Sequence, residues 1–271
     1  MKPDTVLAAG RIALAVEYDG SHYHGWQIQK KPAVPTVQEK LQAALSRVAN
    51  HEVQVHCAGR TDAGVHASAQ VVHFDTTSVR QAKAWVQGVN THLPDDVAVL
   101  WAKAVPQEFH ARFSAERRTY RYVVLNRPVR SPVLAGKVTP VRQALNVEAM
   151  QQAADYLLGE RDFSAFRGAG CQSDSPFRFV EYIRISRQQD LLVTEICANA
   201  FLLHMVRNIM GVLLSIGRGE HVPLWAHEVL ESRDRRCAGV TARPDGLYLV
   251  DVRYPAHFGL PALAPGPVFL R

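Results

Sequence analysis

The most informative stretch of this chain is the octet Gly59-Arg60-Thr61-Asp62-Ala63-Gly64-Val65-His66, which lies between two short runs, 53–57 and 70–74. Alternating and β-branched residues predict that both runs are strands. The two glycines of the octet indicate a shaped loop, because glycine permits backbone conformations that other residues avoid. An arginine beside a carboxylate favours the ionised form, so Asp62, two residues after Arg60, is a candidate nucleophile or base. The alternative is a structural turn in which Asp62 caps its own backbone.

The elements around the octet follow the order βαββαβ, which is the split form called ferredoxin-like. Two segments resemble capping boxes, each followed by apolar residues at helical spacing: Thr36 to Glu39 and Ser78 to Gln81. The second predicted helix has Val79, Ala82, Val86 and Val89 on its inward side. The expected elements are a strand at 11–17, a helix from 36 to 48, strands near 53–57 and 69–75, a helix from 78 to 89 and a strand at 97–101.

The same order returns in the second half of the chain. Asn146 is suited to cap a helix, and Gln188-Gln189-Asp190 is suited to a hairpin turn. The expected elements are a strand at 118–125, a helix from 146, strands at 183–185 and 191–196, helices at 202–216 and 223–230, and a strand at 247–252. The predicted fold is therefore α+β, with two ferredoxin-like βαββαβ units joined edge to edge into one mostly antiparallel sheet with helices on one side.

This order predicts four parts of the chain: an N-terminal extension (1–10), an N-terminal domain that carries the Asp62 loop (11–110), a C-terminal domain (111–254) and a C-terminal tail (255–271). The tail holds four prolines and little periodicity, so we expect an extended arm or partial disorder. Two sheets joined at their edges would leave an open face suited to a large substrate.

Composition narrows the class of protein. The hydrophobic content of 47% supports real cores, and no apolar stretch is long enough to cross a membrane. The start of the chain lacks the apolar core of a signal peptide. Four cysteines without a C-x-x-C spacing argue against disulfides and structural zinc, and the twelve histidines form no H-E-x-x-H or H-x-x-x-H motif. We expect a cytoplasmic protein without membrane contact and without a metal site.

The charge pattern suits a polyanionic partner. The net charge is +6 and the pI is about 9.3, a mild excess that fits nucleic acid and also fits an ordinary basic enzyme. Arginines alternate with aromatic residues between Arg117 and Tyr122. Arginine can contact phosphates through its planar fork, and Tyr120 can stack on an unpaired base. The alternative for Tyr120 and Tyr122 is packing within a sheet, since tyrosine is common in strands.

A second unusual feature is Arg207, which lies in a run from Phe201 to Leu214 that is hydrophobic on nearly every side. Such a helix is expected to be buried, and a buried guanidinium needs an acidic partner. A functional interpretation pairs Arg207 with Asp62, which would lower the pKa of that carboxyl and fix its direction. The structural alternatives are an exposed helix end or an ion pair with Glu195.

Taken together, these stretches resemble the tRNA pseudouridine synthase A family. The resemblance covers about residues 11 to 254, and the octet and the arginine-asparagine helix are specific in combination. The matching stretches are Tyr18 to Gln27, Gly59 to Ala67, Phe109 to Phe113, Arg118 to Tyr122, Asp162 to Phe166, Phe201 to Gly211 and Ala242 to Leu247.

The resemblance implies an isomerase that converts uridine to pseudouridine at positions 38, 39 and 40 in the anticodon stem and loop of tRNA. It implies a homodimer that needs no cofactor. By motif match, Asp62 is the catalytic nucleophile, Tyr120 stacks on the target uracil and helps proton movement, and Arg60 and Arg207 hold the flipped nucleotide and the aspartate.

Two other classes of protein stay open at this point. Tandem RNA-recognition modules share the βαββαβ order, but their aromatic strand signature is missing, and Tyr120 with Tyr122 is the nearest approach. A glycosidase-like hydrolase normally needs two facing carboxylates, and the octet supplies only Asp62.

Overall fold

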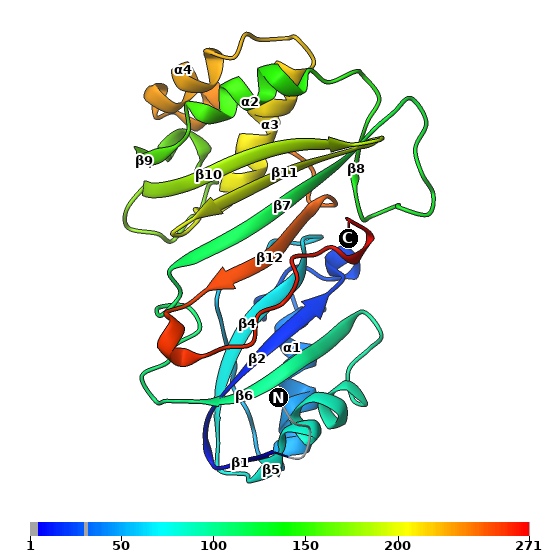
Figure 1. Ribbon diagram of the computed structural model, residues 1–271, viewed down its shortest axis with the longest axis vertical. Coiled ribbons are helices and arrows are strands. Elements are labelled where there is room, and N and C mark those ends of the chain that lie inside the picture. The colour runs from blue at the N-terminus through cyan, green and yellow to red at the C-terminus, as the bar shows by residue number, and fades with distance from the viewer. Residues whose placement is uncertain (1–4, 30–31, 271) are drawn as a thin grey trace. The chain divides into compact units, whose positions relative to one another are not determined.

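The computed structural model describes residues 5–29 and 32–270 (Figure 1). The chain forms two compact units. The first runs to Glu116 and takes up the chain again from Tyr248, and the second is Arg117–Leu247. Both units are mixed α/β, with mostly antiparallel strands, and at this level the predicted fold class is confirmed.

The sheet of the first unit is built around β4, which continues from the end of the octet. β2 lies between β6 and β4, and β3 also pairs with β4, all antiparallel. β12 joins β4 in parallel, with Tyr248 opposite His66. The strands are β2 (Gly10–Tyr18), β3 (His56–Cys57), β4 (His66–Thr76), β6 (Val97–Val105) and β12 (Leu247–Arg253). The predicted strands are found, although the one expected at 53–57 is only two residues long.

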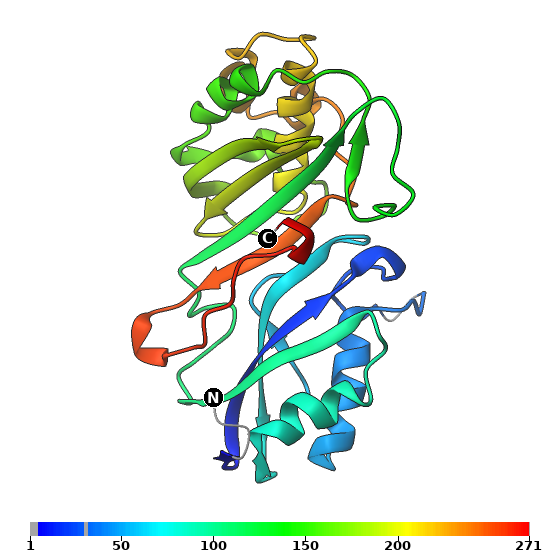
Figure 2. The same cartoon turned by 45° about the vertical axis from the view of Figure 1, so that its right-hand side comes forward.

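Helix α1 (Val37–Ala49) covers one face of this sheet together with a π-helical turn at Ala84–Gly88 (Figure 2). The Thr36 hydroxyl accepts the Glu39 N–H at 3.4 Å, which confirms the predicted N-cap. The side chains at helical spacing, from Val37 to Leu45, are buried and form the core with β2 and β4.

The predicted helix start at Ser78 is wrong. The Ser78 hydroxyl donates to the carbonyl of Ala49, and Val79, expected to face inward, is 54% exposed. The next two residues form β5 (Arg80–Gln81), which pairs with β1 (Val6–Leu7). A strand partner from far along the chain therefore displaced the local capping pattern, and the helical turn begins later.

The second unit contains a sheet in the order β8-β7-β11-β10-β9, antiparallel except for the β7–β8 pair. The predicted hairpin is confirmed, with Gln189 in the left-handed region between β10 and β11. The strands are β7 (Arg117–Asn126), β8 (Thr139–Val141), β9 (Gly159–Asp162), β10 (Phe177–Gln188) and β11 (Leu191–Ala198).

Three helices lie together on one face of this second sheet (Figure 1). They are α2 (Val147–Asp155), α3 (Met205–Gly217) and α4 (Trp225–Ser232). The Asn146 side chain accepts the Ala149 N–H at 2.9 Å, as its type predicts. Helix α3 is buried along nearly its whole length and forms the centre of the unit's core. Short 3-10 turns lie at Gly20–His22, Ser164–Phe166, Arg235–Ala238, Ala256–Phe258 and Val268–Leu270.

The C-terminal segment from Pro255 to Leu270 is an arm packed on the first unit, which is the first of the two expected alternatives. Figure 1 shows it in front of β12 and β4, whereas α1 lies behind them. Phe258 is buried against Phe109 with ring centroids 5.1 Å apart, and the Lys103 ammonium donates to the Phe258 carbonyl at 3.0 Å. These contacts secure the start of the arm to the sheet.

Candidate active-site loop

The octet forms a tight loop between β3 and β4, with Asp62 half-buried and Arg60 exposed. Gly64 has a φ of +77°, in the region that favours glycine. The turn is closed by the Val65 N–H, which donates to the main-chain carbonyl of Asp62 at 3.1 Å. The loop therefore has the defined shape that its two glycines predict.

The loop packs backbone to backbone against Tyr18–Trp26, the other motif of the first unit. The Trp26 N–H donates to the Thr61 carbonyl at 3.0 Å. A Cβ atom added at Gly20 would lie 2.0 Å from the Val65 carbonyl oxygen, and one at Gly25 would lie 2.6 Å from that of Thr61. Only glycine fits at these two positions, so the structure brings together two motifs that lie more than thirty residues apart.

Side chains from β2 and β4 hold the part of the loop that comes just before Asp62. The Tyr18 hydroxyl lies 2.8 Å from the Thr61 hydroxyl in a buried hydrogen bond. The Gln70 amide donates to the Gly59 carbonyl at 2.5 Å and accepts the Gly59 N–H at 3.3 Å. A loop fixed on rigid strands holds a catalytic group in a defined direction, which catalysis requires.

His66, at the end of the octet, is a buried supporting residue that the sequence analysis did not single out. Its Nδ1 accepts the Gly20 N–H at 3.1 Å and lies 3.0 Å from the Asp19 carboxylate. Its ring stacks on Tyr248 with centroids 4.6 Å apart. The signal was present in the sequence, since Asp19 and His66 both belong to the quoted motifs, but their contact depends on the fold.

In the second unit, Tyr120 lies on β7, buried, with its ring edge-to-face with Phe201 at 5.0 Å between centroids. Tyr122 is a structural residue, as the sheet-packing alternative predicts. Its hydroxyl binds the Thr139 hydroxyl at 2.7 Å and donates to the Arg243 carbonyl at 2.8 Å. Burial raises the pKa of Tyr122 well above its ordinary value.

Arg207 lies in the first turn of α3 and is half-buried, although the residues beside it, Val206 and Asn208, are buried. Its Nε donates to the Ala242 carbonyl at 2.9 Å, and its own carbonyl accepts the Ala242 N–H at 3.0 Å. These two hydrogen bonds fix the backbone and the Nε of Arg207 in place. Asp62 and Arg60 belong to the first unit, and Tyr120 and Arg207 to the second.

The alternative partner for Arg207, Glu195, is engaged elsewhere. One carboxylate oxygen of Glu195 lies 2.7 Å from the Nε of Arg121, and the other accepts the Tyr182 hydroxyl at 3.0 Å. This carboxylate therefore belongs to a surface network between β7, β10 and β11.

Asn208, next to Arg207, is a fully buried residue that the sequence analysis left without a role. Its amide donates to the Phe166 carbonyl at 2.8 Å, and its oxygen accepts from Thr241 at 2.7 Å and from Arg235 at 3.0 Å. A Cβ atom at Gly211 would lie 2.0 Å from the Val240 carbonyl. The start of α3 is therefore locked to the segment that precedes β12.

Among residues 5–29 and 32–270, no group of three or more His, Cys, Asp or Glu side chains is placed to hold a metal ion. None of the four cysteines, Cys57, Cys171, Cys197 and Cys237, forms a disulfide. In the same part of the chain, no helix combines the length and apolar character that crossing a membrane requires.

A family model described as tRNA pseudouridine synthase matches residues 14–114 and 153–255, a span that includes both motifs of the loop region and the start of α3. The chain belongs to the tRNA pseudouridine synthase family. It is accordingly an isomerase that acts on tRNA.

Curated members of the family cover nearly the whole chain. Proteins named tRNA pseudouridine synthase A from Vibrio cholerae serotype O1 and Coxiella burnetii are each 56% identical over 260 residues, which is 96% of this chain and 98% and 99% of theirs. One of the same name from Colwellia psychrerythraea is 54% identical over 260 residues, 96% of this chain and 100% of its own.

Proposed function

We propose that this enzyme isomerises uridine to pseudouridine at positions 38, 39 and 40 in the anticodon stem and loop of tRNA, with Asp62 as the nucleophile. The observation that carries the proposal is a half-buried carboxylate on a loop braced by Tyr18, Gln70 and two close glycine contacts, in a chain of this family. The bracing gives Asp62 the fixed direction that a nucleophile needs.

The chemistry suits these residue types. The reaction breaks the bond between C1′ and N1 of uridine, turns the uracil and joins C1′ to C5, after which C5 loses its proton and N1 gains one. Nothing is oxidised and nothing departs from the RNA, so a carboxylate and proton carriers are sufficient, without a cofactor. Asp62 would act either by adding to the ring or by attack or elimination at the sugar.

The target base must leave a stacked stem-loop before it can react, at a cost of a few kcal/mol. We propose that Tyr120 stacks on the flipped uracil and assists the proton transfer. Arg60, exposed beside Asp62, would contact the phosphates of the same nucleotide. Arg207, whose Nε is anchored on the Ala242 carbonyl, would orient the carboxylate of Asp62.

The proposal extends to the architecture and the assembly. Strand order β6-β2-β4-β3 in the first unit, and β7-β11-β10 in the second, supports two ferredoxin-like units as domains 11–110 and 111–254. We further propose a cytoplasmic homodimer that binds the anticodon arm of tRNA, in keeping with the pI of about 9.3.

One experiment separates the candidate activities. The protein is incubated with tRNA labelled in uridine, and the RNA is digested to nucleosides. Pseudouridine supports the proposal, unchanged uridine indicates a binding module, and free uracil indicates a hydrolase. Mapping the modified positions then tests the assignment to positions 38–40.

Replacing Asp62 with Asn tests the nucleophile, because the amide keeps the size of the side chain and loses its charge. We expect a folded protein that binds tRNA and makes no pseudouridine, since loss of a covalent catalyst costs several powers of ten in rate. The structural-turn alternative for Asp62 predicts that Asn, a good turn residue, keeps most of the activity. Turnover above about one per cent of wild type would favour that alternative.

A further inference from the structure

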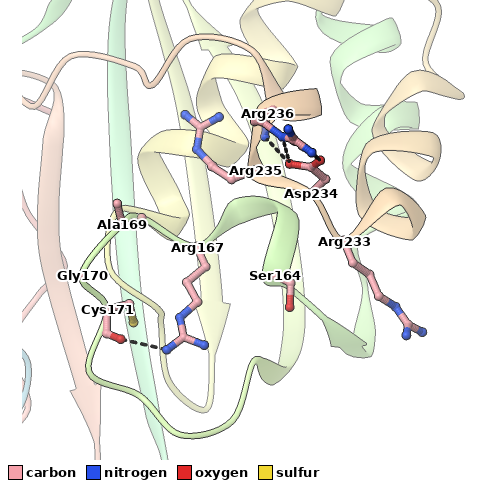
Figure 3. A pocket seen from close by; sticks show the side chains of 10 residues that line it. Ser164, Arg167, Ala169, Gly170, Cys171, Arg233, Asp234, Arg235 and Arg236 are labelled. Carbon is pink, nitrogen blue, oxygen red and sulfur yellow. Dashed lines mark hydrogen bonds and ion pairs between the residues drawn. The ribbon is translucent and has the colours of Figure 1, made fainter.

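A hollow of about 630 Å³ lies in the second unit, between the loop after the 3-10 turn Ser164–Phe166 and the turn at 233–236. Its volume is within the range of about 300–1,000 Å³ that is typical of ligand sites. Figure 3 shows arginine side chains from both segments around it. We call this hollow the arginine pocket; its lining includes Arg167, Cys171, Arg233, Asp234, Arg235 and Arg236.

Two of the four arginines are matched by carboxylates. Arg236 forms a forked ion pair with Asp234, with contacts of 2.5 to 3.0 Å, on an exposed rim. Arg233 lies 3.5 Å from Asp162 and keeps 64% of its side chain exposed. These pairs are weak in solvent and can be exchanged for another anion at little cost.

The other two arginines, Arg167 and Arg235, are half-buried and bonded to neutral oxygens, and the Cys171 thiol also lies in hydrogen-bonding contact with Arg167. Arg167 donates to the main-chain carbonyls of Cys171 at 2.8 Å and Ser173 at 2.6 Å. Arg235 donates to the Gly239 carbonyl at 2.9 Å and to the side-chain oxygens of Asn208 and Thr241, at 3.0 and 2.7 Å. Among the described residues, neither guanidinium has a carboxylate within 4.0 Å.

Within the described part of the chain, the pocket therefore carries two fixed, partly desolvated positive charges that no carboxylate neutralises. Partial burial of a charge costs free energy that an opposite charge can recover. Because both guanidiniums are already held in place, little side-chain freedom remains to be lost when an anion binds. Planar, pre-oriented guanidiniums are the side chains best matched to the oxygens of a phosphate.

We infer that the arginine pocket binds the phosphate backbone of the bound RNA, through Arg167 with Arg233 and Arg235. This inference rests on the proposed function, because it takes tRNA as the partner. Contacts of this kind position a nucleic acid without reading its bases. The pocket would then set how the tRNA lies on the second unit, apart from the chemistry at Asp62.

The test compares Arg167→Gln with Arg142→Gln, which removes the same charge from an exposed position outside the pocket in the same unit. Glutamine at 167 removes the charge and keeps a polar side chain, although its amide ends two bonds short of the Arg167 nitrogen that contacts the Cys171 and Ser173 carbonyls. We expect the Kd for unmodified tRNA to rise about tenfold for Arg167→Gln, as for loss of one charge-assisted contact. The slope of log Kd against log salt should fall by about 1, with kcat at saturating tRNA unchanged.

A second variant, Arg233→Gln, keeps the test valid if Arg167→Gln misfolds, since the Arg233 side chain is mostly exposed and its substitution should not disturb the fold. We expect a two- to fivefold rise in Kd, as for an exposed ion pair. Circular dichroism should show all three variants folded. If Arg167→Gln and Arg233→Gln bind tRNA like Arg142→Gln, with the same salt slope, the inference is overturned.

Calorimetry with inorganic phosphate distinguishes RNA from a free anion. Phosphate binding that is lost in Arg167→Gln, with tRNA affinity unchanged, would assign the pocket to free phosphate and overturn the RNA assignment. Assay of pseudouridine on the same samples separates the two proposals. If the wild type makes pseudouridine and Arg167→Gln binds tRNA as tightly as the wild type, only the role of the arginine pocket is refuted. If the wild type makes no pseudouridine, the proposed function is refuted.

Discussion

His73, buried on β4 near the start of the arm, should make the first unit sensitive to acid. Its Nδ1 accepts the Ala111 N–H at 3.1 Å, and its ring lies 5.0 Å from that of His56 and 4.6 Å from that of His110. Burial, followed by the charges of His110, Arg11 and His56, lowers the pKa of His73 to about 3, against a small opposing effect of Asp75.

The sign follows from proton linkage. In the unfolded chain His73 takes up a proton near pH 6.5, whereas the folded chain resists it until about pH 3. The unfolded state therefore binds more protons between these values, so stability is fully present above pH 6.5 and is lost as the pH falls. pH 5 lies about 1.5 units below the unfolded-state pKa of 6.5, so at this pH the folded protein has lost about 2 kcal/mol of stability through His73.

The perturbation is His73→Asn, because the asparagine oxygen can accept the Ala111 N–H and cannot be protonated in this range. The assay is urea unfolding at pH 7.5 and pH 5.0, followed by tryptophan fluorescence. Trp85, packed edge-on against Phe74 at 5.2 Å, reports on the same core. Between pH 7.5 and pH 5.0, we expect the free energy of unfolding of the wild type to fall by about 2 kcal/mol more than that of His73→Asn.

His92→Asn supplies the control, since His92 is exposed and the same substitution there removes an imidazole from the surface and not from the core. His92→Asn should lose as much stability as wild type. If His73→Asn also loses as much as wild type, within about 0.5 kcal/mol, then His73 is not the source of the acid sensitivity and the reasoning fails.

The remaining predictions concern the two motifs and the arginine pocket. Arg207→Lys should fold and lose at least tenfold in kcat, because lysine keeps the charge without the planar fork. Arg207→Met should shift the acidic limb of the pH–rate profile upward, and an unchanged limb with a near-full rate would show that Arg207 has only a structural role. Gly20→Ala should cost about 1–3 kcal/mol in urea unfolding, because its Cβ would meet the Val65 carbonyl, whereas Gly88→Ala, with 3.7 Å of clearance, should be neutral or stabilising; equal effects would contradict the close-contact argument. Burial raises the pKa of the Cys171 thiol, but the N–H groups of Leu203 and Ser173 and the charge of Arg167 lower that pKa by more. Peptide mapping after treatment with iodoacetamide at neutral pH should therefore find Cys171 alkylated before Cys57, and bound tRNA should slow the alkylation of Cys171.

Much of the fold could be predicted from local sequence because local physics produces it. Side-chain periodicity marks β2, α1 and α3, since a strand or helix must bury one face. Thr36 and Asn146 cap their helices as predicted, because a cap needs only the first turn that follows it. The octet was recognisable as a shaped loop for the same reason, since its glycines act on their own backbone.

Other features depend on partners that the local sequence does not contain. Ser78 to Gln81 has the pattern of a helix start, yet the Val6–Leu7 strand pairs with Arg80–Gln81, and the Ser78 hydroxyl bonds to Ala49 instead. A hydrogen-bonding partner from elsewhere in the chain outweighed a propensity that is worth only about 1 kcal/mol.

The sequence by itself was enough to name Asp62 and Arg60 as candidate site residues, because they stand in a loop whose two glycines indicate a defined shape. Only the tertiary structure decided what holds that loop. The close approach of Gly20 and Gly25 to the loop, the contact of Asp19 with His66, and the placing of Arg167 and Arg235 around one pocket all join segments far apart in the chain. Their energies depend on distances of a few ångströms between such segments, and those distances exist only once the core has packed.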